Sequence, residues 1–142
     1  MPVRTAHAQW QGSIGEGQGT MALGSGAFEG NYSYKSRMED GPGTNPEELI
    51  GAAHAGCFSM ALSLVLGNEG HEPESIDTDA KVRFDKQGDG FAITSIALTT
   101  RARVPGIDEA EFKRLADVAK ENCPVSQALK AVDITLDASL ES

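Results

Sequence analysis

Residues 45–67 read NPEELIGAAHAGCFSMALSLVLG, and this stretch decides the fold. Asn45 is a favourable N-cap, a proline at the first helical position follows it, and a glutamate three residues later completes a pattern close to a capping box. The pattern predicts a helix from Pro46 to about Leu66, with Gly67 as its C-terminal stop. The helix is apolar nearly all round, so we expect it to be buried on most sides.

The chain before this central helix predicts a three-stranded meander. Residues 3–10, 18–28 and 31–37 have the composition of strands, and turns that contain glycine separate them. Arg37 would then lie at the end of the third strand. Residues 39–45 form the loop that leads into the helix.

The chain after the central helix begins with a predicted hairpin. Residues 78–85 alternate between apolar and polar side chains, and a turn at residues 87–90 joins them to a long strand at 91–104. A phase slip between Ile93 and Ile96 indicates a bulge in the long strand.

Two helices and a final strand complete the prediction. Asp108 caps a helix that runs to about residue 121, and Pro124 suits the start of a short helix that ends near Lys130. Residues 132–140 alternate again and form the last strand. The order β-β-β-α-β-β-α-α-β predicts an α+β fold in which helices pack on one side of a mostly antiparallel sheet.

Length, charge and the N-terminal sequence limit the function classes. A chain of 142 residues fits one domain over residues 1–142. A net charge of -9, with no cluster of Lys and Arg, argues against a nucleic-acid partner. The first ten residues lack the apolar core of a signal peptide, so we expect a cytoplasmic protein. The central segment is short for a membrane span and carries His54 near its middle, so we expect a buried helix and no membrane partner.

The chain has two cysteines, Cys57 in the central helix and Cys123 directly before Pro124. By itself, Cys57 favours an inert core thiol, because free cysteine is among the most buried residue types. Cys123 should lie near a helix N-terminus, which lowers the pKa of a thiol. Together they fit a peroxidatic mechanism, in which one thiolate is oxidised to a sulfenic acid and the second thiol condenses with it. The three histidines show no zinc-ligand spacing around either cysteine, so no metal is expected.

A buried thiol needs a cation to become a thiolate, and Arg37 is the best-placed candidate. The alternative for Arg37 is a solvated charge at a strand end. Glu47 could orient Arg37, or it could only favour the helix dipole. Glu47 precedes Cys57 by ten positions, roughly 15 Å along a helix axis, so their side chains cannot meet within one straight helix. A compact site is therefore easier to build if Glu47 comes from a second subunit.

Two motifs resemble those of a known family. The segment from Arg37 to Leu62, RMEDGPGTNPEELIGAAHAGCFSMAL, resembles the signature of the OsmC/Ohr family (osmotically inducible protein C, organic hydroperoxide resistance). The segment CPVSQ at residues 123–127 resembles the second-cysteine motif of that family. The resemblance extends over nearly the whole chain. The position of Arg37 and the paired Glu47-Glu48 resemble the OsmC branch more than the Ohr branch.

The resemblance implies a thiol peroxidase that reduces organic and fatty-acid hydroperoxides in preference to hydrogen peroxide. It implies an intertwined homodimer with two long central helices and active sites at the subunit interface, and no metal or organic cofactor. Carried over by position, Cys57 is the peroxidatic thiol, Cys123 the resolving thiol, Arg37 the activating cation and Glu47 its partner. A dithiol reductant is required, which in the Ohr branch is a lipoylated protein.

Two other functions use the same cysteine pair. A redox sensor would need a segment whose order depends on the disulfide, and the sequence has no free terminal arm or DNA-binding element. A stress-related binding protein would carry the thiols incidentally. Turnover with excess peroxide distinguishes the peroxidase from both.

Overall fold

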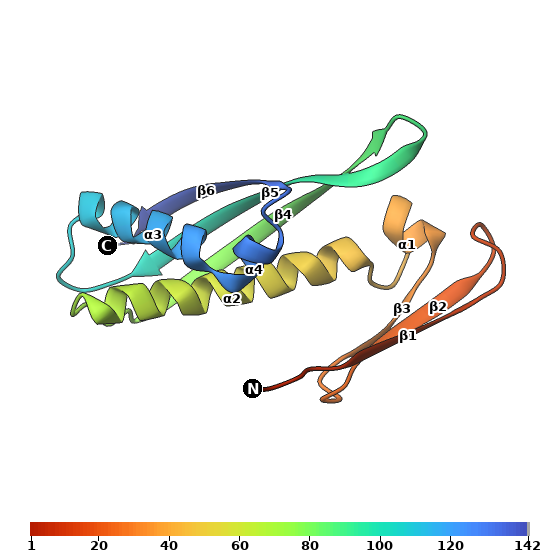
Figure 1. Cartoon of the computed structure of the whole chain (residues 1–142), viewed down its shortest axis with the longest axis horizontal. Helices are drawn as coiled ribbons and strands as arrows, with labels where there is room; N and C mark the ends of the chain where they lie inside the picture. The colour runs from red at the N-terminus through yellow and green to blue at the C-terminus, as the bar shows by residue number, and fades with distance from the viewer. Residues whose placement is uncertain (142) are drawn as a thin grey trace. The chain divides into compact units, whose positions relative to one another are not determined.

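The computed structural model describes residues 1–141 and divides into two compact units, Met1–Leu49 and Ile50–Ser142. Each unit contains one three-stranded sheet (Figure 1). The α+β class predicted from the sequence is confirmed. The assignment of the whole chain to one domain stays a prediction.

The sheet of the first unit is an antiparallel meander, as predicted. Its strands are β1 (Ala6–Gln11), β2 (Gln18–Leu23) and β3 (Glu29–Tyr32), and β2 is the central strand. Strand β1 starts later than the sequence pattern suggested, and β2 and β3 end earlier. Strand β2 stops at Leu23 because the chain turns at Gly24 and Gly26.

The predicted third strand is wrong in its second half, where the structure has the short helix α1 (Tyr34–Met38). The Ser33 hydroxyl accepts a hydrogen bond from the Ser36 N–H at 3.2 Å, and the Ser36 hydroxyl accepts one from the Ser33 N–H at 2.8 Å. This reciprocal capping box starts a helix where composition favoured a strand. Arg37 therefore lies on a helical turn and not at a strand end.

The long helix α2 (Pro46–Asn68) begins at the predicted residue. The Asn45 Oδ1 atom accepts a hydrogen bond from the Glu48 N–H at 2.7 Å, so Asn45 is the N-cap. The Glu48 carboxylate accepts a hydrogen bond from the Thr44 hydroxyl at 2.7 Å. A complete capping box would instead have this carboxylate accept from the Asn45 N–H.

The predicted stop of α2 at Gly67 is wrong, because the helix continues through Gly67 to Asn68. The left-handed residue is Gly70, with a φ of 84°. The His71 N–H then bonds the Leu66 carbonyl at 2.9 Å and closes the helix end. Either glycine could adopt the left-handed conformation that ends a helix. In this structure Gly70, the one nearer the following strand, adopts it.

The sheet of the second unit has the order β4-β5-β6, with β4 at Ser75–Gln87, β5 at Gly90–Arg103 and β6 at Asp133–Leu140. Strands β4 and β5 are antiparallel, whereas β6 runs parallel to β5. The predicted bulge is confirmed: Ser95 pairs with Arg83 and Ile93 pairs with Phe84, which leaves Thr94 as the extra residue.

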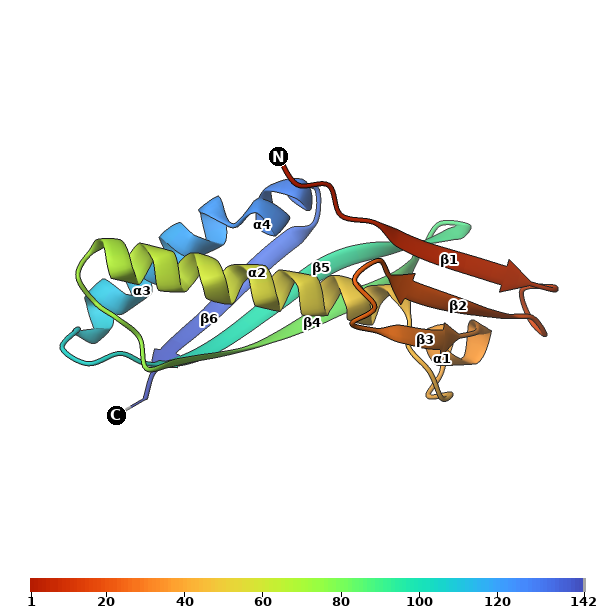
Figure 2. The same cartoon turned by 90° about the horizontal axis from the view of Figure 1, so that it is seen from below.

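Helices α2 and α3 (Glu109–Asn122) cover one face of this sheet (Figure 2), and α4 (Pro124–Ala128) follows α3. The Asp108 carboxylate accepts a hydrogen bond from the Glu111 N–H at 2.8 Å and caps α3, as predicted. The α3–α4 segment is also the crossover that a parallel β5–β6 pair requires. The largest core side chains between the helices and the sheet are Phe58, Leu62, Leu66, Ile96, Leu98, Phe112 and Leu115.

The expectation that α2 is buried on most sides is wrong for this chain by itself. Met60 is 78% exposed and Leu64 is 65% exposed. An exposed face of small and apolar residues runs along the helix, formed by Ala53, Gly56, Met60, Leu64 and Gly67. By length and composition alone α2 could also cross a membrane, a test that core helices of soluble proteins pass as well. We interpret α2 as a core helix, because its opposite face is packed in the core.

The cap of α2 gives a stability prediction. Besides capping α2, Asn45 donates a hydrogen bond from Nδ2 to the Ser36 carbonyl at 3.0 Å, which ties the helix start to α1. Asn45→Ala removes both bonds and should lower the free energy of unfolding by about 1–2 kcal/mol. Equilibrium urea unfolding measures this change.

Asn45→Asp is the matched control. It keeps the acceptor for the cap and loses only the donor to Ser36, so its loss of stability should be smaller than that of Asn45→Ala. Equal urea midpoints for wild type and Asn45→Ala would show that the cap is not needed.

Candidate active site

The two cysteines are placed by separate helices of the second unit. Cys57 is half-buried on α2, and Cys123 is fully buried at the junction between α3 and α4. Cys123 ends α3, where its N–H bonds the Ala119 carbonyl at 2.9 Å, and it starts α4, where its carbonyl accepts the Gln127 N–H at 3.0 Å. Pro124 makes this junction sharp, because it cannot continue α3 yet suits the first position of α4. Both thiols are free.

The two thiols lie near each other in the core, and each shifts the pKa of the other. Burial raises the pKa of Cys57, the Cys123 thiol raises it further, and the Val125 N–H lowers it in part. Burial also acts to raise the pKa of Cys123, but the Ser126 N–H, the Cys57 thiol and the Ser126 hydroxyl outweigh it, so the pKa of Cys123 is lowered. Of the two thiols, Cys57 therefore holds its proton more strongly.

The raised pKa of Cys57 limits the reactivity of this thiol. A thiolate is the nucleophilic form of cysteine, and burial holds the pKa of Cys57 high. A positive charge beside Cys57 would reverse that shift, because an opposite charge favours the ionised form. The sequence prediction of an activating cation thus matches a need that the thiol pair creates.

Arg37 and Glu47, the predicted cation and its partner, form an ion pair in the first unit. The Arg37 Nε and Nη2 atoms both donate to Glu47 Oε1, at 3.0 Å and 2.8 Å. The side chain of Glu47 is only 9% exposed, whereas that of Arg37 is 39% exposed. Glu47 Oε2 is buried and has no hydrogen-bond partner among residues 1–141. The second oxygen of this carboxylate is therefore an open acceptor next to a guanidinium.

The structure thus brings the four predicted residues together as two pairs. Arg37 pairs with Glu47 in the first unit, and Cys57 packs in the same core cluster as Cys123 in the second. Within residues 1–141 no group of three His, Cys, Asp or Glu side chains is arranged to hold a metal ion.

Sequence reasoning missed two residues beside the thiols, His54 and Ser126. His54 is fully buried on α2, and its Nε2 atom lies 2.8 Å from the Ser126 hydroxyl on α4. Ser126 in turn lowers the pKa of the nearby Cys123 thiol through its N–H and its hydroxyl. A spacing signal exists for each: His54 precedes Cys57 by three residues on α2, and Ser126 follows Cys123 by three, which puts each on the same helix face as a cysteine.

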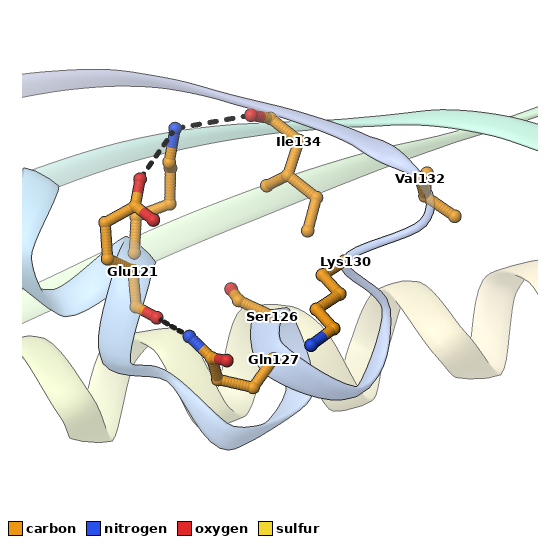
Figure 3. Close-up of a pocket in the computed structure, with 7 residues that line it drawn as sticks. Glu121, Ser126, Gln127, Lys130, Val132 and Ile134 are labelled. Atoms are coloured by element: carbon orange, nitrogen blue, oxygen red, sulfur yellow. Dashed lines mark hydrogen bonds and ion pairs between the residues drawn. The ribbon is translucent and has the colours of Figure 1, made fainter.

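Ser126 also lines a cavity of about 180 Å³ (Figure 3). Lys120 and Lys130 line it, and Lys120 donates a hydrogen bond to the Ile134 carbonyl at 3.3 Å. Gln127 on α4 donates a hydrogen bond to the carbonyl of Glu121 on α3, which links the two helices. Two ammonium groups thus line the cavity that Ser126 also lines.

Comparisons with known proteins agree with this fold. The model of the OsmC-like protein family matches residues 39–137. A peroxiredoxin OsmC of Escherichia coli (strain K12) is 54% identical over 140 residues, which cover 98% of this chain and 97% of that protein. An organic hydroperoxide resistance protein of Xanthomonas axonopodis pv. citri is 37% identical over 98 residues, 68% of this chain and 67% of that protein.

A solved structure of an OsmC-like protein of unknown function from Vibrio cholerae has the same fold. It covers 97% of this chain and 99% of its own, with a TM-score of 0.77 at 17% identity. The fold and the family match define a peroxiredoxin-like redox protein. The chain belongs to the OsmC family, which confirms the prediction made from its motifs.

The coupling of the thiols predicts opposite effects of removing each one. Cys123→Ala removes the thiol that raises the pKa of Cys57, so the pKa of Cys57 should fall. Cys57→Ala removes a hydrogen-bond donor to Cys123, so the pKa of Cys123 should rise. The rate of iodoacetamide alkylation against pH measures the pKa, and each variant has one thiol, so no assignment is needed.

Shifts in the same direction for both variants would contradict the coupling. Thermal unfolding of both variants provides the control, because a loosened core would change burial as well as the thiol contact.

Proposed function

We propose that this protein reduces organic hydroperoxides to alcohols through a sulfenic acid on Cys57 and a disulfide between Cys57 and Cys123. The observation that carries the proposal is that the two thiols, which come from different helices, pack in the same core cluster and shift each other's pKa. Proximity is what a resolving thiol needs in order to condense with a sulfenic acid before further oxidation.

The enzyme class is that of a peroxidase. Relatives of the chain include a peroxiredoxin and organic hydroperoxide resistance proteins. The chemistry then has two steps on the protein. The Cys57 thiolate attacks the outer oxygen of the hydroperoxide, the O–O bond breaks, and the leaving alkoxide takes a proton to become the alcohol. The Cys123 sulfur next attacks the Cys57 sulfur, the S–O bond breaks, and the oxygen leaves as water.

Arg37 and Glu47 supply the charge for the first step. The Arg37 guanidinium would stabilise the Cys57 thiolate and the alkoxide that forms when the O–O bond breaks. Glu47 holds that guanidinium through two hydrogen bonds to one oxygen, which limits its orientations. The ion pair, with a buried carboxylate and a partly exposed guanidinium, is thus suited to positioning a cation.

A second subunit completes the site in this proposal. The exposed face of α2 supports it, because Met60 and Leu64 lie in water in the single chain and the small residues Ala53 and Gly56 permit close helix contact. Two such helices packed antiparallel across a two-fold axis would bring the Glu47 end of each toward the Cys57 of the other. The protein would then be a homodimer with two shared sites.

The remaining partners follow from the chemistry. The apolar side chain of Met60, exposed on α2 three residues after Cys57, would favour organic hydroperoxides over hydrogen peroxide, which is small and well hydrated. A dithiol must reduce the disulfide by exchange, and a lipoylated protein is the donor that the Ohr branch implies. Free thiols suit a reducing compartment, so we place the enzyme in the cytoplasm.

Single-turnover kinetics test the two cysteine roles. With stoichiometric cumene hydroperoxide, Cys57→Ser should consume no peroxide. Cys123→Ser should consume one equivalent and stop at a sulfenic acid, which dimedone captures and mass spectrometry detects. Wild type should form the disulfide and react faster with cumene hydroperoxide than with hydrogen peroxide. A burst that survives in Cys57→Ser would reverse the two roles, and no turnover of excess peroxide with any dithiol would favour a sensor.

A mixed dimer tests the shared site, provided that the Glu47→Ala homodimer is strongly impaired. One subunit carries Cys57→Ser and the other Glu47→Ala, with different affinity tags for isolation. A shared site leaves one intact centre, so the activity should approach about half that of the wild-type dimer. Almost no activity would place Glu47 and Cys57 of one site on the same subunit, and a monomer at working concentration would remove the idea.

A further inference from the structure

The cavity that Lys120 and Lys130 line is a feature that the proposed mechanism does not use. Its lining residues come from α3, α4, β6 and the chain between α4 and β6, and neither cysteine is among them. All of them belong to the second unit. The volume of about 180 Å³ lies below the roughly 300–1,000 Å³ of pockets for drug-sized ligands, so a ligand here would be small.

The ammonium group of Lys130 is an exception among the cations of this acidic chain. It makes no hydrogen bond or ion pair among residues 1–141. Arg101, Arg103 and Arg114, in contrast, are each paired with a carboxylate. In a chain whose net charge is -9, a cation without a carboxylate partner stands out. Lys130 therefore offers its charge and three N–H donors to a ligand of the cavity.

Lys120 brings a second ammonium group, which the protein holds in place. Its Nζ atom donates to the Ile134 carbonyl at 3.3 Å and lies 3.7 Å from the Glu121 carboxylate. These contacts occupy two of its three N–H donors, so one is left for a ligand. The side chain is only 24% exposed, so it has less freedom to lose on binding than a fully solvated lysine has.

The carboxylate of Glu121 limits the charge that a ligand can carry. Glu121 lines the same cavity and is paired with Lys120, so one of the two ammonium groups is already neutralised. The cavity thus has two cationic groups against one anionic group. This surplus suits a singly charged anion such as a carboxylate, whereas Glu121 would repel the second charge of a phosphate.

An apolar wall adjoins the ammonium groups. Val132 and Ile134 line the cavity, and both side chains also pack against the core. In Figure 3 the side chain of Ile134 extends from β6 toward α4. A cationic end beside an apolar wall matches a ligand that has a carboxylate at one end and a short hydrocarbon part at the other.

We propose that this cavity binds a small carboxylate that has a short apolar part. The ammonium groups of Lys120 and Lys130 hold the carboxylate. The side chains of Val132 and Ile134 pack against the apolar part. The site goes beyond the proposed function, because it requires neither thiol and no peroxide.

Ser126 relates this site to the cysteines in space. Its side chain lines the cavity, and its hydroxyl lies 2.8 Å from Nε2 of the buried His54. His54 precedes Cys57 by one turn of α2, and Ser126 follows Cys123 by three residues. A ligand in the cavity would therefore rest on the segment that carries Cys123 without touching either sulfur.

A titration of the intact, reduced protein with sodium butyrate tests the site. Backbone amide shifts in NMR spectra, recorded at constant ionic strength, should saturate and be largest in residues 120–134. Acetate lacks two methylene groups for the apolar wall, so it should bind up to about tenfold more weakly. Inorganic phosphate should also bind more weakly than butyrate, because Glu121 opposes its second charge.

Variants of the lining residues test the two parts of the site. Lys130→Gln and Lys120→Gln should each weaken butyrate binding about tenfold, because each removes a charged donor. Val132→Thr keeps the shape of the side chain but adds a hydroxyl, so it should weaken butyrate binding and leave acetate binding unchanged. Urea unfolding without ligand verifies that each variant is folded.

Lys86→Gln is the matched control. Lys86 lies on β4, makes no ion pair among residues 1–141 and does not line the cavity. The substitution changes the net charge by the same amount as Lys130→Gln does. The affinity for butyrate should therefore stay at the wild-type value.

The outcomes separate this proposal from the peroxidase function. Butyrate affinity that Lys130→Gln leaves unchanged, or that Lys86→Gln lowers equally, would overturn the site. Phosphate that binds more tightly than butyrate would overturn the assignment of a carboxylate ligand. Shifts that do not saturate with any of the three anions would overturn the proposal as a whole. None of these measurements uses peroxide, so a protein that forms no disulfide would overturn the proposed function and leave the butyrate result intact.

Discussion

The proximity of the Cys57 and Cys123 thiols is the constraint on which the rest of the site depends. It exists because α2 carries one sulfur into the interior while the break between α3 and α4 brings the other sulfur near it. Burial raises the pKa of Cys57, whereas hydrogen bonding outweighs burial at Cys123 and lowers its pKa. The pair is therefore asymmetric before any substrate arrives.

The two cysteines therefore differ in the groups that shift their pKa values. The polar groups of α4 favour negative charge on Cys123, through the Ser126 N–H and hydroxyl. At Cys57 the Val125 N–H acts in the same direction, but burial and the Cys123 thiol outweigh it and the pKa is raised. An external cation is then required for attack on peroxide, and the Arg37–Glu47 pair is built to present one, with a buried carboxylate that holds the guanidinium at two points.

Helix α2 links packing to function. One face packs its large side chains against β5 and α3, while the opposite face leaves Met60 and Leu64 in water. A helix of this composition is stable only if both faces find a partner, since exposed apolar area is unfavourable. The same element that forms the core of one chain thus also presents the surface on which we propose that a second chain packs.

The sequence by itself determined the elements with strong local signals. The Asn45 and Asp108 caps, the alternation in β4 and the slip that marks the bulge at Thr94 all appear in the structure as expected, because caps, strand alternation and bulges depend on residues close in the chain. The family, and with it the pair of cysteines, was also readable from the motifs at residues 37–62 and 123–127.

Only the tertiary structure decided the features that depend on contacts between distant residues. Hydrogen bonds from Ser36 to Thr44 and from Asn45 to Ser36 hold α1, and with it Arg37, beside the start of α2. The mutual pKa shifts of Cys57 and Cys123, and the hydrogen bond between His54 and Ser126, depend on α2 meeting the α3–α4 segment. No local pattern encodes that meeting, because hydrogen bonding between helices is set by how their faces pack.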